Sequence, residues 1–331
     1  MMEQALLPYY ISAPTDGRDM TKEIEATLEK YGTCFLGTGD FVTHGIVMPE
    51  GATLMGAGAA TRLSLSPHVK SGAAVRLSSF TTVKDLTIEG GLSEYPEAVG
   101  ERHGILFEGN VFTDDDDHRG QIHNSTVAGC FITGFSGGGI TCRHTGYHIT
   151  CAILASDCHI LCSGAGINVE RFSEFHKFTN ILCADNLYGC INNGGNNMFV
   201  NCGFSSNKTG FFIDNEHGQS PNCAHGSCVG CTFHHADKNT GIGILIKNEI
   251  PGFVFDGCQI GHSKIVIENS DCVSFVAMNF LRRVAIHISG GTLTLFSSSM
   301  FHEKPTVTIE NNDAVRFDSC YLKDGTPFTG N

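Results

Sequence analysis

The chain has 331 residues, among them 40 glycines, 15 cysteines and no tryptophan, and 41% of its residues are hydrophobic. The glycines follow no three-residue period and the apolar content is ample, which excludes a collagen-like chain and a disordered one. The formal net charge of −13 argues against nucleic acid and against an anionic membrane surface, because clustered Lys and Arg hold both.

The N-terminal residues up to Pro8 contain neither a basic segment nor a long apolar one, so we expect no cleaved signal peptide. No apolar run approaches the roughly 18 residues that span a bilayer. We therefore expect a cytoplasmic protein. Its cysteines are expected to be free buried thiols, with disulfides or a metal site as the alternatives.

An amphipathic helix is predicted at residues 21–31. Asp19 can cap its N-terminus, Ile24, Leu28 and Tyr31 share one face, and Gly32 follows as the stop.

A cysteine repeat begins about one third of the way along the chain. Each copy is a cysteine, any residue, and a large apolar residue. The copies start at Cys130, Cys158, Cys202, Cys231, Cys258 and Cys320, with Met278 and Ser299 in the last gap and Ile181-Leu182-Cys183 between Cys158 and Cys202. From Cys202 onward the steps are 29, 27, 20, 21 and 21 residues.

A second strand of alternating apolar residues follows each copy at a similar offset. These strands are residues 104–108, 139–143, 166–170, 188–192, 211–214, 244–247, 265–268, 286–288 and 307–310. Asparagine follows several of them, at Asn193, Asn215, Asn248, Asn269 and Asn311, where it tolerates left-handed turns and can form a ladder.

Short strands, glycine and asparagine corners and a period of 20 to 29 residues predict an all-β, right-handed parallel β-helix of about ten coils. No segment after residue 31 keeps helical spacing for long, and antiparallel strands would not repeat one residue at one position. We expect a single domain over residues 1–331, in which 1–32 hold the capping helix and 33–331 form the coils.

Residues 15–91 carry a family resemblance. After the predicted helix come Gly39-Asp40-Phe41, then Pro49-Glu50-Gly51-Ala52-Thr53-Leu54-Met55-Gly56-Ala57-Gly58 and Ala60-Thr61-Arg62-Leu63. This run resembles the entry coil of the pectate-lyase-superfamily β-helices, which include bacteriophage tailspikes. The resemblance implies the fold; for chemistry it allows lyases, hydrolases, transferases and adhesins. The catalytic motifs of polygalacturonases and pectate lyases have no match here.

Aligning the second strands places their outward residues in one polar column. Its members are Glu108, Arg143, Glu170, Asn192, Asp214, Lys247, Glu268, Ser289 and Glu310. Glu170 and Asp214 flank Asn192, so their backbones are expected roughly 9 to 10 Å apart, a spacing that suits acid/base cleavage of a glycan. Arg171 or Lys247 is the cation expected to keep one carboxylate ionised, although such charges also simply solvate a surface.

Two longer coils add loops near this column, and loops on rigid scaffolds often carry function. We predict Glu170, Asp214, Glu216 and His217 as catalytic residues. Substrate contacts are predicted for Arg171, His176, Asn192, Asn193, His234, His235, Asp237 and Lys247.

Two segments of the sequence contain residues that could bind a metal. Cys223, His225, Cys228, Cys231 and His234 have zinc-like spacing, but Cys228 and Cys231 belong to interior strands. The run Asp114–Asp117 is better explained as a solvated loop than as a calcium site. We expect no metal and no cofactor.

Two functions follow. One is a carbohydrate-active enzyme that cleaves or rearranges a glycan or oligosaccharide by carboxylate chemistry. The other is a tailspike-like phage protein that recognises surface polysaccharide without catalysis, and it predicts a homotrimer.

Overall fold

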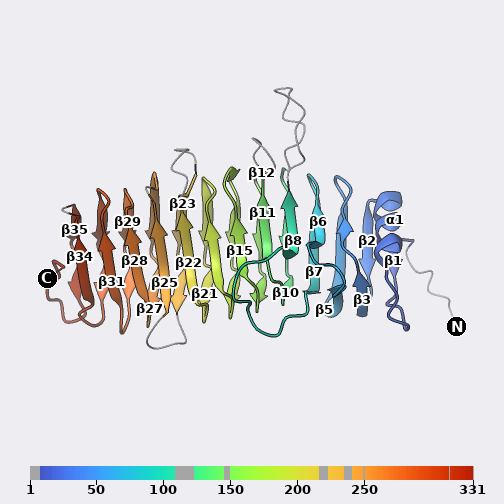
Figure 1. Ribbon diagram of the computed structural model, residues 1–331, viewed down its shortest axis with the longest axis horizontal. Coiled ribbons are helices and arrows are strands. Elements are labelled where there is room, and N and C mark those ends of the chain that lie inside the picture. Colours follow the sequence, from blue (N-terminus) through green and yellow to red (C-terminus); the bar gives the residue numbers. More distant parts are fainter. Residues whose placement is uncertain are drawn as a thin grey trace, which may run out of the picture.

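The computed structural model describes residues 8–108, 123–144, 150–215, 223–234, 241–248, 250–312 and 314–330. Its strands stack in a long row, with helix α1 (Thr21–Tyr31) beside the first coils and the C-terminus at the opposite end (Figure 1). No helix in these ranges is long and apolar enough to cross a membrane.

Each coil contributes strands to three faces, taken in chain order as face 1, face 2 and face 3. Faces 1 and 2 join into one 23-stranded sheet, because β5 (Thr53–Leu65) and β7 (Thr82–Glu89) run across both. Face 3 is a separate 11-stranded sheet.

Face 1 begins beside β1 (Tyr10–Ile11) and contains the first strand of each coil. Its strands are β2 (Thr33–Leu36), β9 (Thr126–Ala128), β13 (Leu154–Ser156), β17 (Lys177–Thr179), β20 (Asn197–Val200), β23 (His225–Val229), β26 (Gly252–Asp256), β29 (Val273–Val276), β32 (Thr294–Ser297) and β35 (Val315–Asp318).

Face 2 contains the second strand of each coil. Its strands are β3 (Gly39–Thr43), β10 (Phe131–Thr133), β14 (His159–Leu161), β18 (Leu182–Ala184), β21 (Gly203–Ser205), β24 (Thr232–His234), β27 (Gln259–Gly261), β30 (Asn279–Phe280), β33 (Met300–Phe301) and β36 (Tyr321–Leu322).

Face 3 closes each coil, and a two-stranded sheet of β12 (Thr150–Cys151) and β16 (Ser173–Glu174) lies apart from it. The strands of face 3 are β4 (Ile46–Val47), β6 (Gly72–Leu77), β8 (Arg102–Glu108), β11 (Gly138–Arg143), β15 (Ala165–Val169), β19 (Tyr188–Asn192), β22 (Thr209–Asp214), β25 (Ile242–Lys247), β28 (Lys264–Glu268), β31 (Ala285–Ser289) and β34 (Thr306–Glu310).

The named strands pair in parallel with their counterparts one coil along. Ile132 pairs with Ile160, which pairs with Cys183, so residues of one coil position stack along the axis. The predicted parallel β-helix is therefore confirmed; the right-handed sense that we expect for it is the one that parallel connections almost always take.

The cysteine repeat lies inside, as predicted. Cys130, Cys158, Cys202, Cys231, Cys258 and Cys320 are buried, and all fifteen cysteines are free thiols. Each of the six repeat cysteines follows a residue in the left-handed conformation, so the chain turns the corner from face 1 to face 2 and then places a small apolar side chain inside. Burial raises the pKa of Cys34 to about 12 and that of Cys228 to about 11, which keeps these thiols protonated.

Phenylalanine rings fill the rest of the interior in stacks along the axis. Phe255, Phe275, Phe296 and Phe317 follow one another with centroids 5.0, 4.8 and 4.7 Å apart and interplanar angles of 9° or less.

Helix α1 packs against β2 and β4 at the N-terminal end of the stack, burying Ile24 and Leu28. Asp19 accepts hydrogen bonds from the Thr21 backbone N–H (3.0 Å) and hydroxyl (2.6 Å), and Gly32 ends the helix in the left-handed conformation. Tyr31, expected on the buried side, is 40% exposed.

Six glycines occupy one position near the start of successive face 3 strands. They are Gly104, Gly139, Gly166, Gly189, Gly210 and Gly243. A Cβ built on any of the first five would lie 2.4 to 3.0 Å from the carbonyl oxygen of the next glycine in the series. Here the coils approach too closely for any side chain.

Candidate functional site

An outward row of polar side chains runs along face 3 near the ends of its strands, and we call it the charged row. Pairing places Glu108 opposite Arg143, Asp214 opposite Lys247, and Lys247 opposite Glu268. Glu170 follows Val169, the partner of Cys142, and therefore continues the row beside Arg143. The predicted column is thus present, with one exception.

Asn192 was predicted to be part of this row and is not. It pairs with interior Val169 and is fully buried, where its Oδ1 accepts a hydrogen bond from Asn197 Nδ2 (2.9 Å). Asn193, one residue later, takes the outward place: its Oδ1 accepts a hydrogen bond from the Asp214 backbone N–H (2.9 Å). A shift by one residue along a strand exchanges inside for outside.

Arg143 is the centre of the charge cluster. Its Nε donates to Glu170 Oε1 (3.0 Å), its terminal nitrogens donate to Glu101 Oε2 (3.2 Å), and Glu108 lies 4.0 Å away. Partial burial disfavours the charged guanidinium, but Glu170 and Glu101 outweigh it and raise the pKa of Arg143. Arg76 forms a further ion pair with Glu108. The cation that serves Glu170 is therefore Arg143; Arg171 and Lys247 form no ion pair with Glu170 in the described chain.

His103 lies beneath Arg143 and is 1% exposed. Its Nδ1 accepts a hydrogen bond from the Gly138 backbone N–H (3.0 Å) and lies 2.9 Å from the Thr141 hydroxyl, which leaves the proton on Nε2. Burial, assisted by the charge of Arg143, lowers the pKa of His103 to about 4. The imidazole is therefore neutral near pH 7, with Nε2 3.4 Å from Arg143 and 3.8 Å from Glu101.

Asp214 is held differently. Asn248 Nδ2 donates to its Oδ1 (2.7 Å), while Asn193 receives its backbone N–H. Lys247, next in the row, is paired with Glu268 (3.1 Å). Asp214 is thus oriented by neutral amides, whereas Glu170 is paired with a cation.

An apolar strip lies beside the charged row. Phe212, two residues before Asp214 and on the same side of β22, is partly exposed and stacks on Tyr188 (centroids 5.4 Å apart). Aromatic faces beside carboxylates and amides suit the mixed polar and apolar surface of a sugar ring.

Two other predicted substrate contacts have different surroundings in the structure. Arg171 follows β15, with its guanidinium over the Phe172 ring (5.0 Å). His176, predicted to contact substrate, is instead fully buried: its Nδ1 accepts from the Ile153 backbone N–H (3.3 Å) and its ring meets Phe178 edge-on. It serves the interior, so that prediction is wrong.

The buried His176 predicts acid sensitivity. Burial lowers its pKa to about 3, so between that pH and its unfolded value near 6.5 the unfolded chain binds a proton that the folded chain cannot. This contribution to stability is complete above about pH 6.5 and falls by about 1.4 kcal/mol per pH unit below it. The free energy of unfolding, measured with urea at pH 7 and at pH 5, decreases on acidification. We expect this decrease to be about 2 kcal/mol smaller in His176→Gln than in wild type. The control is His287→Gln, on the outer side of β31, which is expected to show the same decrease in unfolding free energy as wild type. The interpretation would be contradicted if His176→Gln showed that same decrease.

The predicted loop residues fall into two groups. Glu216, His217, His235 and Asp237 lie outside the described residues, as does the Asp114–Asp117 run. His234 ends β24 on face 2, where burial lowers its pKa. It precedes β25, whereas Lys247 ends that strand, so about 17 Å of strand separates His234 from the charged row. The structure does not bring His234 together with Glu170 and Asp214.

Among the described residues, no group of three or more His, Cys, Asp or Glu side chains is arranged to hold a metal. The cysteines with zinc-like spacing do not form a metal-binding group among the described residues. Cys223, Cys228 and Cys231 are fully buried.

Sequence reasoning missed the roles of Glu101, His103, Asn248 and the Tyr188–Phe212 pair. The available signal was the adjacency of Arg143 and Glu170 in the aligned column. Glu101 and His103 could not be found this way, because they reach Arg143 from the start of β8 and the residue before it.

No protein-family model matches the chain, and no curated protein matches it. Solved structures do match. The A-module of the Azotobacter vinelandii mannuronan C-5 epimerase AlgE4 superposes with a TM-score of 0.64 at 13% identity, covering 95% of both chains. The tailspike of E. coli bacteriophage HK620, solved with a pentasaccharide, gives 0.67 at 11% identity, covering 93% of this chain and 64% of the tailspike.

The tailspike gp49 of Acinetobacter baumannii bacteriophage Fri1, described as a capsular polysaccharide depolymerase, gives 0.53 at 12% identity over 97% of this chain and 62% of its own. At such identities the likeness is one of fold. The chain spans less than two thirds of either tailspike.

Proposed function

We propose that this protein binds a glycan along face 3 and cleaves it with Glu170 and Asp214 as the carboxylate pair. The observation that carries the proposal is the charged row itself, in which two differently held carboxylates flank Asn193. Their backbones are two strands apart, about 9.5 Å, which leaves room for a water molecule between carboxyl groups and favours inversion at the anomeric carbon.

The surroundings suggest a role for each group. Glu170, paired with Arg143, is suited to act as the base that activates water. Asp214, which forms no ion pair with any described residue, is the carboxyl group that we assign to protonate the leaving oxygen. Asn193 and Lys247 flank Asp214 and would position sugar hydroxyl groups, while Phe212 and Tyr188 offer an apolar face. Glu216 and His217, which follow Asp214 closely in the sequence, remain proposed catalytic residues.

The second candidate is a tailspike-like receptor-binding protein of a virion, which holds surface polysaccharide without cleaving it. The ion pairs favour this reading, because Glu170 and Lys247 both have partners and could serve structure alone. A homotrimer belongs to this candidate. Exposed apolar side chains along face 1, namely Leu154, Met198, Val229 and Val254, offer a surface for association, and light scattering measures the assembly.

One screen tests the proposal and separates the candidates. A library of bacterial capsular and O-antigen polysaccharides is assayed for binding and for release of new reducing ends. The proposed enzyme gives both signals on the same glycan, and the non-catalytic receptor gives binding alone. Absence of binding to any library member would contradict both.

A further inference from the structure

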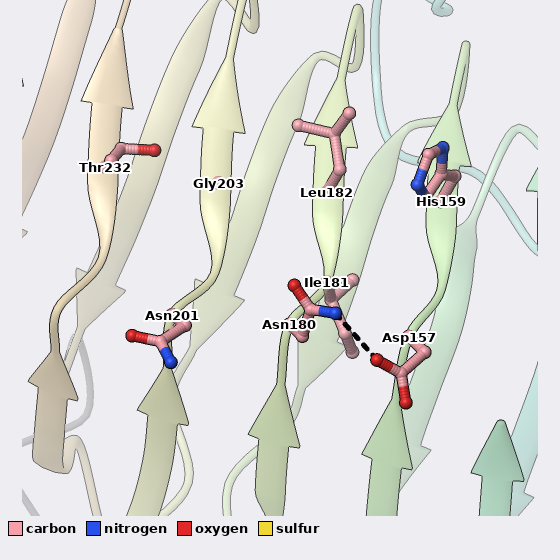
Figure 2. Close-up of a pocket in the computed structure, with 8 residues that line it drawn as sticks. All are labelled: Asp157, His159, Asn180, Ile181, Leu182, Asn201, Gly203 and Thr232. Atoms are coloured by element: carbon pink, nitrogen blue, oxygen red, sulfur yellow. Dashed lines mark hydrogen bonds between the residues drawn. The ribbon is translucent and has the colours of Figure 1, made fainter. Parts of the chain in front are cut away.

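A hollow of about 380 Å³ lies at the corner between faces 1 and 2, apart from the charged row (Figure 2). Asp157, Asn180 and Asn201 form its rim, and His159, Leu182 and Thr232 form its walls around Gly203. The strands of face 1 separate this corner from the one where the charged row lies. We call it the corner groove.

The groove exists because one side chain is missing from a row. His159, Leu182, Gly203 and Thr232 are paired across successive face 2 strands. The fold does not require glycine there: the backbone of Gly203 is not left-handed, and a Cβ would meet only the Leu182 Cδ1 at 3.1 Å and the Thr232 Oγ1 at 3.5 Å. This contrasts with the glycine series of face 3, where backbone blocks any side chain.

The rim of the groove is polar, and glycines occupy the equivalent corner position on either side of it. Asp157, Asn180 and Asn201 occupy the same left-handed corner position in three successive coils, at φ 54°, 55° and 52°. The coils before and after place Gly129, Gly230 and Gly257 there. The left-handed corners beside Gly203 thus carry side chains that can form hydrogen bonds. In the adjoining coils this corner position is occupied by glycine.

These groups retain unused bonding capacity. Asn180 Nδ2 donates to Asp157 Oδ1 (2.6 Å), and no other described residue bonds to Asp157 Oδ2 or to the side-chain Oδ1 of Asn180 (Figure 2). The exposed Asn201 amide has no hydrogen-bond partner in the described ranges. Two amides and a carboxylate offer both donors and acceptors, which is what vicinal hydroxyl groups need.

The charge of the lining selects the kind of sugar. It contains a carboxylate and no lysine or arginine, unlike the charged row with Arg143 and Lys247. An anionic sugar would meet Asp157 without a compensating cation. Leu182 and the His159 ring, which lies against Phe131 (6.4 Å between centroids), supply the apolar side.

We propose that the corner groove is a second glycan-binding site, which takes uncharged sugar residues and acts independently of cleavage on face 3. It deepens the proposed function by dividing recognition between two corners of the solenoid: neutral units at the groove and the reacting unit at the charged row.

The test fills the groove. Maltotriose, cellotriose, chitotriose and trigalacturonate are titrated by ligand-observed NMR against wild type, Gly203→Leu and the control Asn279→Leu. The control adds the same side chain to the same face 2 row, outside the groove. At least one neutral trisaccharide is expected to bind wild type and Asn279→Leu equally, and to bind Gly203→Leu at least tenfold more weakly. Asn201→Ala, which alters only an exposed side chain, is expected to weaken the same ligand and serves if Gly203→Leu does not fold.

Three outcomes would overturn the proposal: no neutral trisaccharide binds, Gly203→Leu and Asn201→Ala bind like wild type, or trigalacturonate is the ligand displaced by Gly203→Leu. Failure of the proposed catalysis is seen separately, because Asp214→Asn is expected to leave groove binding unchanged.

Discussion

Asp214→Asn is expected to lower the rate of glycan cleavage by about a thousandfold while leaving glycan binding within about twofold of wild type. The amide has nearly the same shape as the carboxyl, but it cannot deliver a proton to the leaving oxygen. The Asp214 backbone N–H still donates to Asn193, so the strand pairing of β22 is unaffected. Reducing-end release and equilibrium binding, measured on the glycan that the screen identifies, provide the two readouts.

Glu268→Gln is the matched control for this variant. Glu268 points outward in the same row, next to Lys247, and its partner is a cation as in the case of Glu170. Its replacement is expected to change cleavage by less than about threefold, because an exposed ion pair contributes little. Glu170→Gln is expected to match Asp214→Asn in rate. If both variants keep full activity, the assignment of the carboxylate pair is wrong; if they lose binding as well as turnover, the row serves recognition alone.

Gly189→Ala is expected to destabilise the fold by about 3 kcal/mol, at the upper end of the range for overpacked interiors. The added methyl group would lie 2.4 Å from the Gly210 carbonyl oxygen and 2.6 Å from Asn207 Nδ2. Asn207 is buried and donates to the Cys183 carbonyl (2.9 Å), while its Oδ1 accepts from the Asn186 backbone (2.9 Å). The backbone cannot yield without separating two coils, and the amide cannot yield without losing these bonds.

Urea denaturation measures this effect, with Gly203→Ala as the control. That glycine also lies on a central strand, but its Cβ would meet only the ends of two side chains. Its replacement is expected to be neutral or slightly stabilising, because it restricts the unfolded chain. Equal destabilisation by both substitutions would show that loss of glycine as such, and not the close approach of coils, determines the cost.

The fold could be predicted because the solenoid repeats its interior. Cys183 illustrates this: the sequence placed Ile181 at the cysteine position and Cys183 at the large apolar position, and pairing with Ile160 and Phe204 confirms it. Because equivalent positions recur in every coil, the alignment of one strand can be checked against the strands of the neighbouring coils.

The repeat does not predict the register of a strand after a corner. The alternation of Tyr188-Gly189-Cys190-Ile191-Asn192 continues in the structure, with Cys190 and Asn192 both inside, but the aligned column assumed that Asn192 was outside. The asparagine ladder expected after face 3 strands is best developed elsewhere, at Asn186 and Asn207 in the turns before them. Turn length varies from coil to coil, and nothing in a periodic pattern fixes the register after a turn.

The ion-pair partners of the charged side chains also could not be predicted from the sequence. The positions of Arg143 and Lys247 in the row were predictable. That Arg143 is the ion-pair partner of Glu170 was not, because it depends on the direction of the Arg143 side chain and on its contacts with Glu101 and His103. Likewise, sequence proximity placed His234 near Asp214, although the length of β25 separates them. Nearness along the chain and nearness along the axis are different quantities in a solenoid.

The stacked phenylalanines imply that this molecule can change length in whole units. Phe275, Phe296 and Phe317 are separated by 21 residues each. Phe275 and Phe296 each stack on an equivalent ring above and below, and Phe317, at the end of the row, meets Phe328 edge-on. Excising residues 276–296 would place Phe317 on Phe275 with the contacts that Phe296 had provided, and the strands on all three faces would close in the same register. Duplication or loss of one coil is therefore nearly neutral for the interior, while it moves surface sites closer together or farther apart by one strand spacing of about 4.8 Å. Such steps offer a way to match the distance between two binding positions to the repeat of a polymer without redesigning either position.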